Sequence, residues 1–325
     1  MNTEMDNKRI QEIDPSLFRF VGNDTISSEK IIAPRYSYWR SVFRVFFKRK
    51  LNIFLIFMFV LIMLSSFLMP SLCPYDQFEN VTNPATFNLS PAAAMKYFGG
   101  FSLKWLFGTG SVGNSIFYGI FASAKTSLLL AIICAAINMT VGIIMGAIWG
   151  YSKKFDAVML VIYNIVANVP YLLLISVLVY IVGSGFGSFV FALTITGWMG
   201  IAYFFRTQVM IIRDREYSLA SRCLGTPITR VISKNILPFL TSVITTLLAT
   251  ELPSYISSEV YLSFIGIGLS ATVPSLGRMI SNAQTAFITF PWAFWPPVAI
   301  AALITIILYI LGQNLADATD PRTHM

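Results

Sequence analysis

Two acidic residues lie deep within one long apolar stretch of the sequence. Glu251 and Glu259 are eight positions apart, so on a helix they would lie about 80° apart, on roughly one side. Ionisable side chains at membrane depth are costly, which makes each a candidate for function. Pro253 lies between them and predicts a kink that a cavity could accommodate. The hypothesis is that these residues line a substrate pathway, and the alternative is that Glu259 is a structural partner of an adjacent loop.

Other kinds of chemistry find little support in the residue types. The single histidine, His324, is the penultimate residue, and the three cysteines are too far apart for a disulfide or zinc pattern. Residues 108–115, GTGSVGNS, match a dinucleotide-binding pattern and approach a phosphate loop. A phosphate loop needs lysine where Asn114 stands, and a dinucleotide site needs a preceding strand, so both interpretations fail. We expect this chain to have no catalytic residues, no metal site and no bound cofactor.

The composition places the chain in a membrane. Of its 325 residues, 56% are hydrophobic and 12% are charged, with a mean hydropathy of +0.69, whereas soluble domains carry about 25% charged residues. An apolar stretch of about 20 residues spans the hydrocarbon core as a helix. The predicted fold class is therefore an all-α integral membrane protein with about six transmembrane helices, at residues 51–69, 126–150, 157–182, 189–212, 237–264 and 295–311.

The distribution of lysine and arginine predicts the orientation. These residues concentrate before the first span and in the segments that would share its side, so both termini are expected in the cytoplasm. The net charge of +8 is thus a topology signal, and we expect no nucleic-acid partner. Lys125 and Arg206 lie near predicted span ends and are expected to snorkel to the interface. The predicted organisation is a cytoplasmic segment (1–50), the first span (51–69), an extracellular segment (70–125), a transmembrane core (126–314) and a cytoplasmic tail (315–325).

The cytoplasmic segment 213–238 carries the signals of two short helices. Asp214 is a helix-capping residue type, and Glu216 would lie in the first turn, where a carboxylate suits the helix dipole. Gly225 is a natural helix stop. Thr226 can cap the next helix with Pro227 at its first position. We expect two short helices at an angle, lying at the inner membrane surface.

This segment resembles a motif of a known family. Integral membrane subunits of binding-protein-dependent ATP-binding-cassette importers carry an EAA…G…LP motif in a cytoplasmic loop between two late spans. Its glycine matches Gly225, its leucine and proline match residues 237–238, and its alanines align with Ala220 and Ser221. The motif's glutamate falls on Leu219, a departure, although Glu216 fits an EY…AARALG variant.

The resemblance runs from about residue 18 to the C-terminus. The chain resembles the C-type subunit of oligopeptide permeases, and its extended N-terminal segment is similar to versions from Gram-positive bacteria. The matching strings are YSYWRSVFRVFFKRK, CPYDQFE, LFGTGSVGNSIF, GWMGIAYFFRTQV, EVYLSFIGIGL, PSLGRMIS and GQNLADATDPRTH. Within this family, GTGSVGNS is a turn that leads into the second span. The small residues of that span, including Gly142 and Gly146, suit close helix packing.

The resemblance implies a function and a set of partners. The chain would be a multi-pass protein of the bacterial plasma membrane that imports oligopeptides together with a homologous B-type permease. Two ATPase subunits would bind ATP and Mg²⁺, and an extracellular lipoprotein would deliver the peptide across the lipid bilayer. Segment 213–238 would form the coupling helix that docks on an ATPase. The residues expected to couple are Glu216, Tyr217, Ala220, Ser221, Arg222, Leu224, Gly225, Thr226 and Pro227.

Alternative functions remain open at the level of sequence. An ion- or proton-coupled secondary peptide transporter often has ten or more spans, repeats and buried proton-relay residues, and these are not evident here. A related permease for dipeptides or nickel chelates fits the same motifs. A channel or structural subunit would leave the capped cytoplasmic segment unexplained.

Overall fold

The computed structural model describes residues 38–320, so most of the predicted N-terminal segment and the last five residues lie outside the described range. The chain divides into two units, residues 1–41 and 42–325. The second unit contains all the helices described below except the first residues of α1. The described residues form helices joined by turns and contain no β-strand. The prediction of an all-α membrane protein is confirmed.

Within residues 38–320, five helical segments are long and apolar enough to cross a membrane, and a bent helix pair supplies a sixth if it is counted as one span. The crossing segments are α2 (Lys50–Leu72), α4 (Ile116–Tyr151), α7 with α8 (Phe186–Thr194 and Trp198–Arg213), α10 to α11 (Ile228–Arg230 and Thr241–Phe264) and α13 (Pro291–Thr319). The bent pair is α5 with α6 (Lys153–Ala167 and Tyr171–Val182). The shorter helices are α1 (Tyr38–Lys48), α3 (Pro91–Tyr97), α9 (Glu216–Cys223) and α12 (Leu276–Ala283).

The predicted third span is not one continuous helix. Helices α5 and α6 meet at an angle of 81° around Asn168–Pro170. Proline has no backbone N–H to continue the ladder and disfavours helical geometry in the residue before it. Pro170 is therefore the physical reason for the break, and it is visible in the sequence.

Helix α4 begins ten residues before the predicted second span. The Ser115 hydroxyl accepts a hydrogen bond from the Tyr118 backbone N–H and caps the helix, which then runs for 36 residues. At 1.5 Å per residue it is about 54 Å long, more than the ~30 Å of the hydrocarbon core. The helix therefore extends into the predicted extracellular segment 70–125. Lys125 lies within the helix, with its ammonium group over the Phe67 ring, 5.6 Å from the ring centroid.

The irregular backbone of the fifth span lies at Pro238 rather than at Pro253. Residues Val231–Ile236 form a π-helix and Leu237–Leu240 a 3₁₀-helix, because Pro238 cannot donate the hydrogen bond that a regular α-helix requires. Helix α11 then continues through Pro253 without interruption. The local break that Pro253 could have opened is therefore absent from α11, and the kink expected there stays a prediction. The sixth span also runs further than expected, because α13 continues to Thr319.

Helices α4 and α8 pack through a row of glycines. An ideal Cβ atom on Gly146 would lie 2.6 Å from the Ala202 carbonyl oxygen and 2.9 Å from the Phe205 Cβ. Gly142 and Gly150, one turn to either side, meet α8 at similarly short range. Small residues permit this approach of two backbones, which stabilises helix pairs in lipid through close packing. The predicted packing role of Gly142 and Gly146 is confirmed.

Adding one methyl group to this row is expected to destabilise the bundle. The Gly146→Ala variant should lower the free energy of unfolding by about 1–3 kcal/mol because the carbonyl oxygen of Ala202 cannot move without displacing α8. Gly200→Ala is the matched control, since its Cβ would meet no atom within 4 Å, and alanine favours a helix by about 1 kcal/mol. Thermal unfolding in detergent should therefore shift in opposite directions for the two variants. A shift in the same direction would contradict the packing argument.

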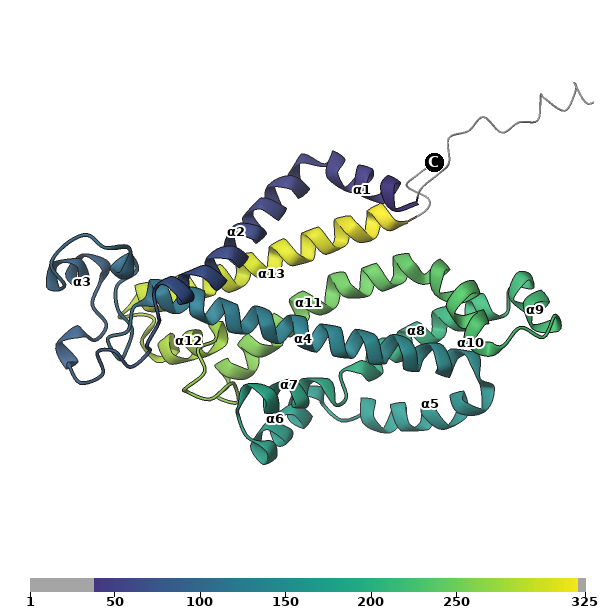
Figure 1. The fold of residues 1–325 in the computed structure, drawn as a ribbon. Coiled ribbons are helices and arrows are strands. Elements are labelled where there is room, and N and C mark those ends of the chain that lie inside the picture. Colours follow the sequence, from purple (N-terminus) through teal and green to yellow (C-terminus); the bar gives the residue numbers. More distant parts are fainter. Residues whose placement is uncertain (1–37, 321–325) are drawn as a thin grey trace, which may run out of the picture. The chain divides into compact units, whose positions relative to one another are not determined.

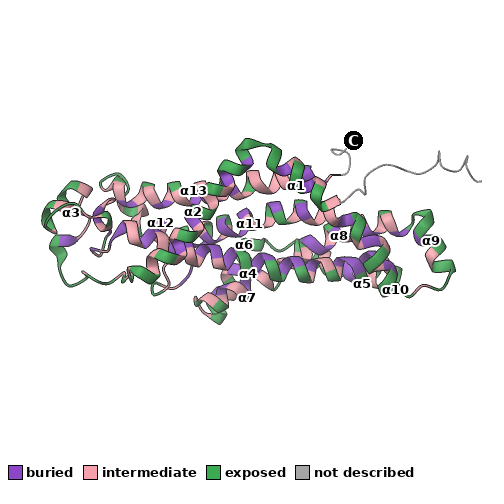
Figure 2. Cartoon of the chain, turned by 45° about the horizontal axis from the view of Figure 1, so that its top comes forward, coloured by how far each residue is buried: buried purple, intermediate pink, exposed green. Residues whose placement is uncertain are grey.

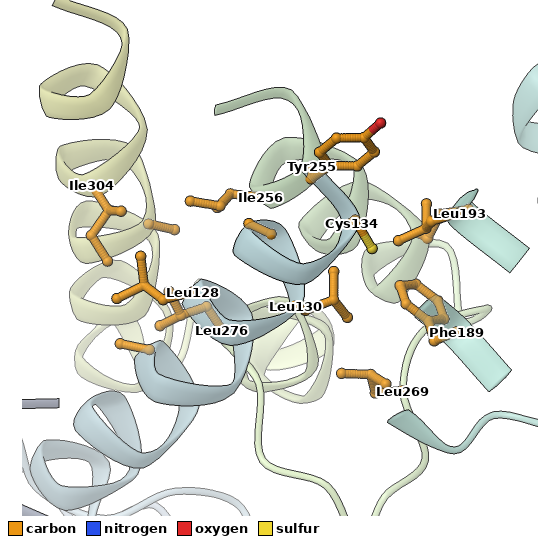
Figure 3. Close-up of a cluster of buried hydrophobic side chains, with 14 of the residues drawn as sticks. Leu128, Leu130, Cys134, Phe189, Leu193, Tyr255, Ile256, Leu269, Leu276 and Ile304 are labelled. Carbon is orange, nitrogen blue, oxygen red and sulfur yellow. The ribbon is translucent and has the colours of Figure 1, made fainter. Parts of the chain in front are cut away.

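A buried apolar cluster joins all five crossing segments (Figure 3). Leu128 and Leu130 of α4 meet Phe189 of α7, Ile256 of α11 and Ile304 of α13, and each is at most 2% exposed. Their side chains interdigitate where the helices cross. Helix α4 is thus the central element of the bundle.

Arg206 has partners within the bundle that the sequence did not predict. Its guanidinium forms an ion pair with Asp156 of α5, in which Nη2 lies 2.8 Å from Oδ2 and Nε contacts Oδ1. The same group lies over the rings of Trp149 and Tyr203, at 5.5 and 5.6 Å from their centroids. Trp149 Nε1 also donates to Asp156, at 2.7 Å. This cluster attaches the broken third span to the α4–α8 pair.

The long segments between spans gather at two opposite ends of the residue 42–325 unit. Helices α3 and α12 lie at one end and helices α9 and α10 at the other (Figure 1). The segment expected outside the cell, 70–125, contacts the turn before α12, where Gln77 Nε2 donates to the Ala271 carbonyl oxygen. The predicted cytoplasmic segment lies at the far end.

Candidate functional site

Helix α9, the predicted coupling helix, begins with a different cap from the one expected. The N-cap residue is Arg215, whose side chain makes no capping hydrogen bond, and Glu216 lies in the first turn. Asp214 instead ends α8 and binds the Arg213 guanidinium through both oxygens, at 2.9 and 2.8 Å. This guanidinium keeps the pKa of Asp214 below its usual value. The prediction that Asp214 caps α9 is wrong because the preceding arginine is the nearer partner.

Gly225 ends α9 in the conformation that only glycine adopts easily. Its φ angle is +74°, and its N–H donates to the Arg222 carbonyl oxygen while Thr226 N–H donates to that of Ser221. These two bonds define a Schellman motif, which satisfies the last carbonyl groups of a helix. The predicted role of Gly225 as a helix stop is confirmed. A Cβ there would meet no atom within 4 Å, so the requirement for glycine is conformational.

The second short helix begins one residue later than predicted. Pro227, rather than Thr226, occupies the N-cap position, with extended backbone at ψ 146°, and α10 starts at Ile228. The helix passes after one turn into the π-helix Val231–Ile236 and then into the fifth span. As expected, two short helices connect α8 to α11, but the second of them begins one residue later than predicted.

Side-chain contacts fix α9 to the end of the bundle. Asn235 Nδ2 donates to the Ser221 hydroxyl at 2.7 Å, across the turn. The Tyr217 ring lies 5.4 Å from the Phe239 ring, and the Arg222 guanidinium lies 5.7 Å from the centroid of Tyr151 in α4. These contacts connect α9 to α4 and to the start of the fifth span.

The surface of this segment carries large apolar side chains away from the spans. Leu224 is 86% exposed, Ile228 is 56% exposed, and Tyr217 and Leu219 are both more than 40% exposed. Figure 2 shows α9 largely in the colour of exposed residues. Arginine and glutamate residues occur between the apolar ones, so the segment is not lipid-facing like the spans. Exposed apolar groups on a water-facing segment are typical of a protein-binding surface.

Of the nine predicted coupling residues, seven are exposed on this segment, and Ser221 and Thr226 are half-buried. The sequence prediction did not include Leu219, which it treated only as a departure from the motif, nor Ile228. The sequence could have indicated both residues, because each is an apolar residue in an otherwise polar stretch.

Glu259 lies at the opposite end of the bundle and is fully buried. Its Oε1 accepts hydrogen bonds from the hydroxyls of Ser275 at 2.6 Å and Ser263 at 3.0 Å. Its Oε2 accepts from the Ser127 hydroxyl at 2.9 Å and from the Gly277 backbone N–H at 3.4 Å. The side chain has no surface exposed to a path in this conformation. The contacts join α4 and α11 to the start of α12. This arrangement fits the alternative that Glu259 is a structural partner of an adjacent loop.

Glu251 has a different environment from Glu259. It is half-buried near the hydroxyl of Tyr255, which accepts a hydrogen bond from Asn138 Nδ2 at 2.5 Å. Asn138 also donates to the Leu193 carbonyl oxygen at 3.3 Å, so this polar group joins α4, α7 and α11. Pro253 is buried in the same helix. A substrate-path role for Glu251 and Pro253 stays a prediction, and unchanged peptide uptake by Glu251→Gln would contradict it.

The sequence GTGSVGNS forms a turn that leads into α4. Gly110 N–H donates to the Asn114 carbonyl oxygen at 2.9 Å, Gly113 N–H donates to that of Gly110 at 3.0 Å, and Ser115 caps the helix. No strand precedes this turn in residues 38–320, so it lacks the context of a nucleotide site. The turn lines a cavity at the α12 end of the unit.

A helical membrane bundle with an exposed, precisely terminated helix between two of its spans has the features of a transport permease. The family model described as binding-protein-dependent transport system inner membrane component matches residues 138–325, and that of the N-terminal transmembrane domain of oligopeptide transport permease C matches residues 37–91. The chain belongs to the family of binding-protein-dependent transport system inner membrane components. It is a multi-pass protein of the bacterial plasma membrane.

Three curated relatives cover almost the whole chain. The oligopeptide transport system permease protein AmiD of Streptococcus pneumoniae is 44% identical over 96% of this chain and 99% of its own length. The dipeptide transport system permease protein DppC of Bacillus subtilis is 30% identical over 91% of this chain and 89% of its own length. The oligopeptide transport system permease protein OppC of the same organism is 29% identical over 96% of this chain and 99% of its own length.

Proposed function

We propose that this chain forms, with a homologous B-type permease, the path by which oligopeptides enter the cell. It is a permease subunit of an ATP-binding-cassette peptide importer, and the chain itself is not an enzyme. The observation that carries the coupling role is α9, with its glycine stop and exposed Leu224 at the end of the bundle. The family membership also argues against an ion- or proton-coupled secondary transporter.

The proposed division of work assigns ATP chemistry to other subunits. Two ATPases bind ATP and Mg²⁺ and hydrolyse the nucleotide, and α9 of this chain docks in a groove on one of them. An extracellular lipoprotein delivers the peptide. ATP binding shifts the permease pair between inward- and outward-facing states because the closed ATPase dimer binds one state more tightly. The contacts of α9 with Tyr151 and Asn235 support this transmission.

Oligopeptides are the proposed cargo. The relative with the highest identity quoted above is named for oligopeptide transport and shares 44% of its residues with this chain, compared with 30% for the dipeptide permease. A dipeptide importer is the second candidate, because the dipeptide permease still aligns over 91% of the chain. Competition for uptake between dipeptides and hexapeptides in vesicles that contain the whole importer would distinguish the two.

Two native cysteines allow a test of the orientation and of ATPase docking. Cys223 is exposed at the end of α9, Cys73 is partly exposed at the end of α2, and Cys134 is buried. In a Cys73→Ser chain, we expect a membrane-impermeant maleimide to label Cys223 in inside-out vesicles only, and bound ATPase subunits to slow that labelling at least tenfold. In a Cys223→Ser chain, the same reagent should label Cys73 from the outside.

Labelling of Cys223 from outside would contradict the cytoplasmic location of α9. Labelling from inside at an unchanged rate after ATPase assembly would contradict docking on this helix. The two variants serve as controls for each other because each retains one of the two accessible cysteines, and these lie at opposite ends of the spans.

A further inference from the structure

A cavity of about 340 Å³ lies at the end of the bundle opposite α9. Its walls come from the segment between α2 and α4, from the turn before α12, from α12 itself and from the start of α13. Ligand-binding pockets for small molecules begin at about this size. The proposed orientation places this end of the molecule outside the cell.

The cavity has one charged group in its wall. Arg278 of α12 is the single lysine, arginine, aspartate or glutamate among the described residues that line it. Its Nε atom is buried and has no hydrogen-bond partner in the described part of the chain. The wall of the cavity thus offers a positive charge with no acidic residue beside it in the described lining. The guanidinium plane suits a carboxylate in particular, because two parallel N–H groups match its two oxygens.

Neutral polar groups and an apolar wall complete the cavity. Asn282 of α12 and Gln77 and Asn114 from the segment before α4 line it, and Asn114 Nδ2 donates to the hydroxyl of Tyr75 at 2.8 Å. Side-chain amides are hydrogen-bond donors and acceptors that suit a peptide backbone. Asn88, Ser111 and Thr285 add further neutral polar groups to the wall. The apolar part of the wall includes Ile116, Met279 and Ala293, which belong to one buried apolar cluster.

The arginine stands on a rigid support. The hydroxyl of Ser275 accepts a hydrogen bond from the Arg278 backbone N–H at 3.1 Å and donates its own proton to Glu259 at 2.6 Å. The Leu276 backbone N–H donates to the Ser127 hydroxyl of α4 at 3.1 Å. The carboxyl oxygens of Glu259 accept from these α12 and serine donors. Arg278 contributes to the wall of the cavity.

We propose that this cavity binds the C-terminal carboxylate of the peptide cargo, with Arg278 as the carboxylate ligand. The proposal rests on the proposed function, since it takes the cavity to face the outside and the cargo to be a peptide. Every linear peptide carries a C-terminal carboxylate whatever its sequence, so one arginine with neutral amides around it selects the end of a peptide without selecting its side chains. The apolar wall receives the last side chain.

The test uses the complete importer in vesicles and one hexapeptide that the binding protein binds equally well as the free acid and as the C-terminal amide. Wild type is expected to transport the free acid about tenfold faster than the amide at low concentration, the discrimination of one charge-assisted bidentate contact. In Arg278→Gln the free acid should fall to the rate of the amide, while the amide rate is unchanged. Arg278→Lys, which keeps the charge but loses the bidentate geometry, should lie between.

Lys96→Gln is the matched control, because Lys96 is an exposed cation of the same outer segment that does not line the cavity. It should leave the discrimination intact. Equal rates for acid and amide in wild type would overturn the proposal, as would an equal fall of both rates in Arg278→Gln. An equal fall with weaker capture of the binding protein would assign the carboxylate to that protein instead. Continued ATP-dependent uptake of the amide in each case keeps the proposed function separate from this site.

Discussion

Replacing Leu224 by aspartate is expected to abolish ATP-dependent peptide uptake while leaving the chain folded in the membrane. The Leu224 side chain is 86% exposed, so the substitution removes almost no contact within the chain. If Leu224 enters an apolar groove on the ATPase, the variant buries an unpaired carboxylate there. Such a charge at an interface costs about 2–5 kcal/mol, which corresponds to a loss of roughly 30-fold to several thousand-fold in affinity. Vesicle uptake and co-purification of the ATPases with the tagged chain measure the effect.

Two control variants separate docking from other consequences of the Leu224 change. Leu224→Met keeps an apolar side chain of similar size and should retain uptake. Leu103→Asp places the same carboxylate at an exposed leucine near the opposite end of the bundle and should leave ATPase binding intact. Full uptake with bound ATPases in Leu224→Asp would show that α9 does not dock through this residue.

Replacing Glu259 by leucine is expected to give the largest loss of stability. The variant leaves the hydroxyls of Ser127, Ser263 and Ser275 and the Gly277 N–H without their acceptor in a buried site. Each unsatisfied buried group costs about 1–3 kcal/mol, so the total is about 3 kcal/mol or more even after partial relaxation. Thermal unfolding of the purified chain in detergent should show a lower midpoint, and hydrogen exchange should increase first in α12.

The matched control for this substitution is Glu251→Leu, which removes a carboxyl group from the same helix eight residues earlier. Glu251 is only half-buried and has fewer partners, so its midpoint should fall less. In the Glu259→Leu background, Ser263→Ala removes one of the orphaned hydroxyls and should recover part of the loss. Strictly additive losses for the pair would contradict the hydrogen-bond explanation.

Much of the architecture could be predicted from the sequence because the bilayer imposes simple rules. Backbone groups in lipid must be hydrogen-bonded within the chain, so each long apolar stretch is expected to be helical. Five of the six predicted spans contain such a helix, and the bent pair α5 with α6 supplies the sixth if it is counted as one span. Local chemistry at Gly225 was equally predictable, since a glycine after a short helix is the residue that adopts positive φ without strain. The close contact at Gly146 follows from the absence of a side chain.

The errors arose where two local signals competed. Asp214 is a good capping residue, but Arg213 beside it offers a charged partner, and the carboxylate turns to that partner instead. The predicted second span began at residue 126, but α4 already begins at Ile116, and Lys125 lies within it with its ammonium group over the Phe67 ring of α2. The break at Pro170 was present in the sequence and was hidden by the apolar residues on both sides.

The sequence by itself determined the membrane-spanning helices, the family and the helix stop at Gly225, because these depend on composition and on backbone preferences over a few neighbouring residues. Only the tertiary structure decided the environment of the buried charges. Glu259 meets partners more than 100 residues away in α4, and Arg278 meets a cavity wall from the segment before α4. Such contacts depend on how the helices pack, which periodicity and spacing along one chain do not specify.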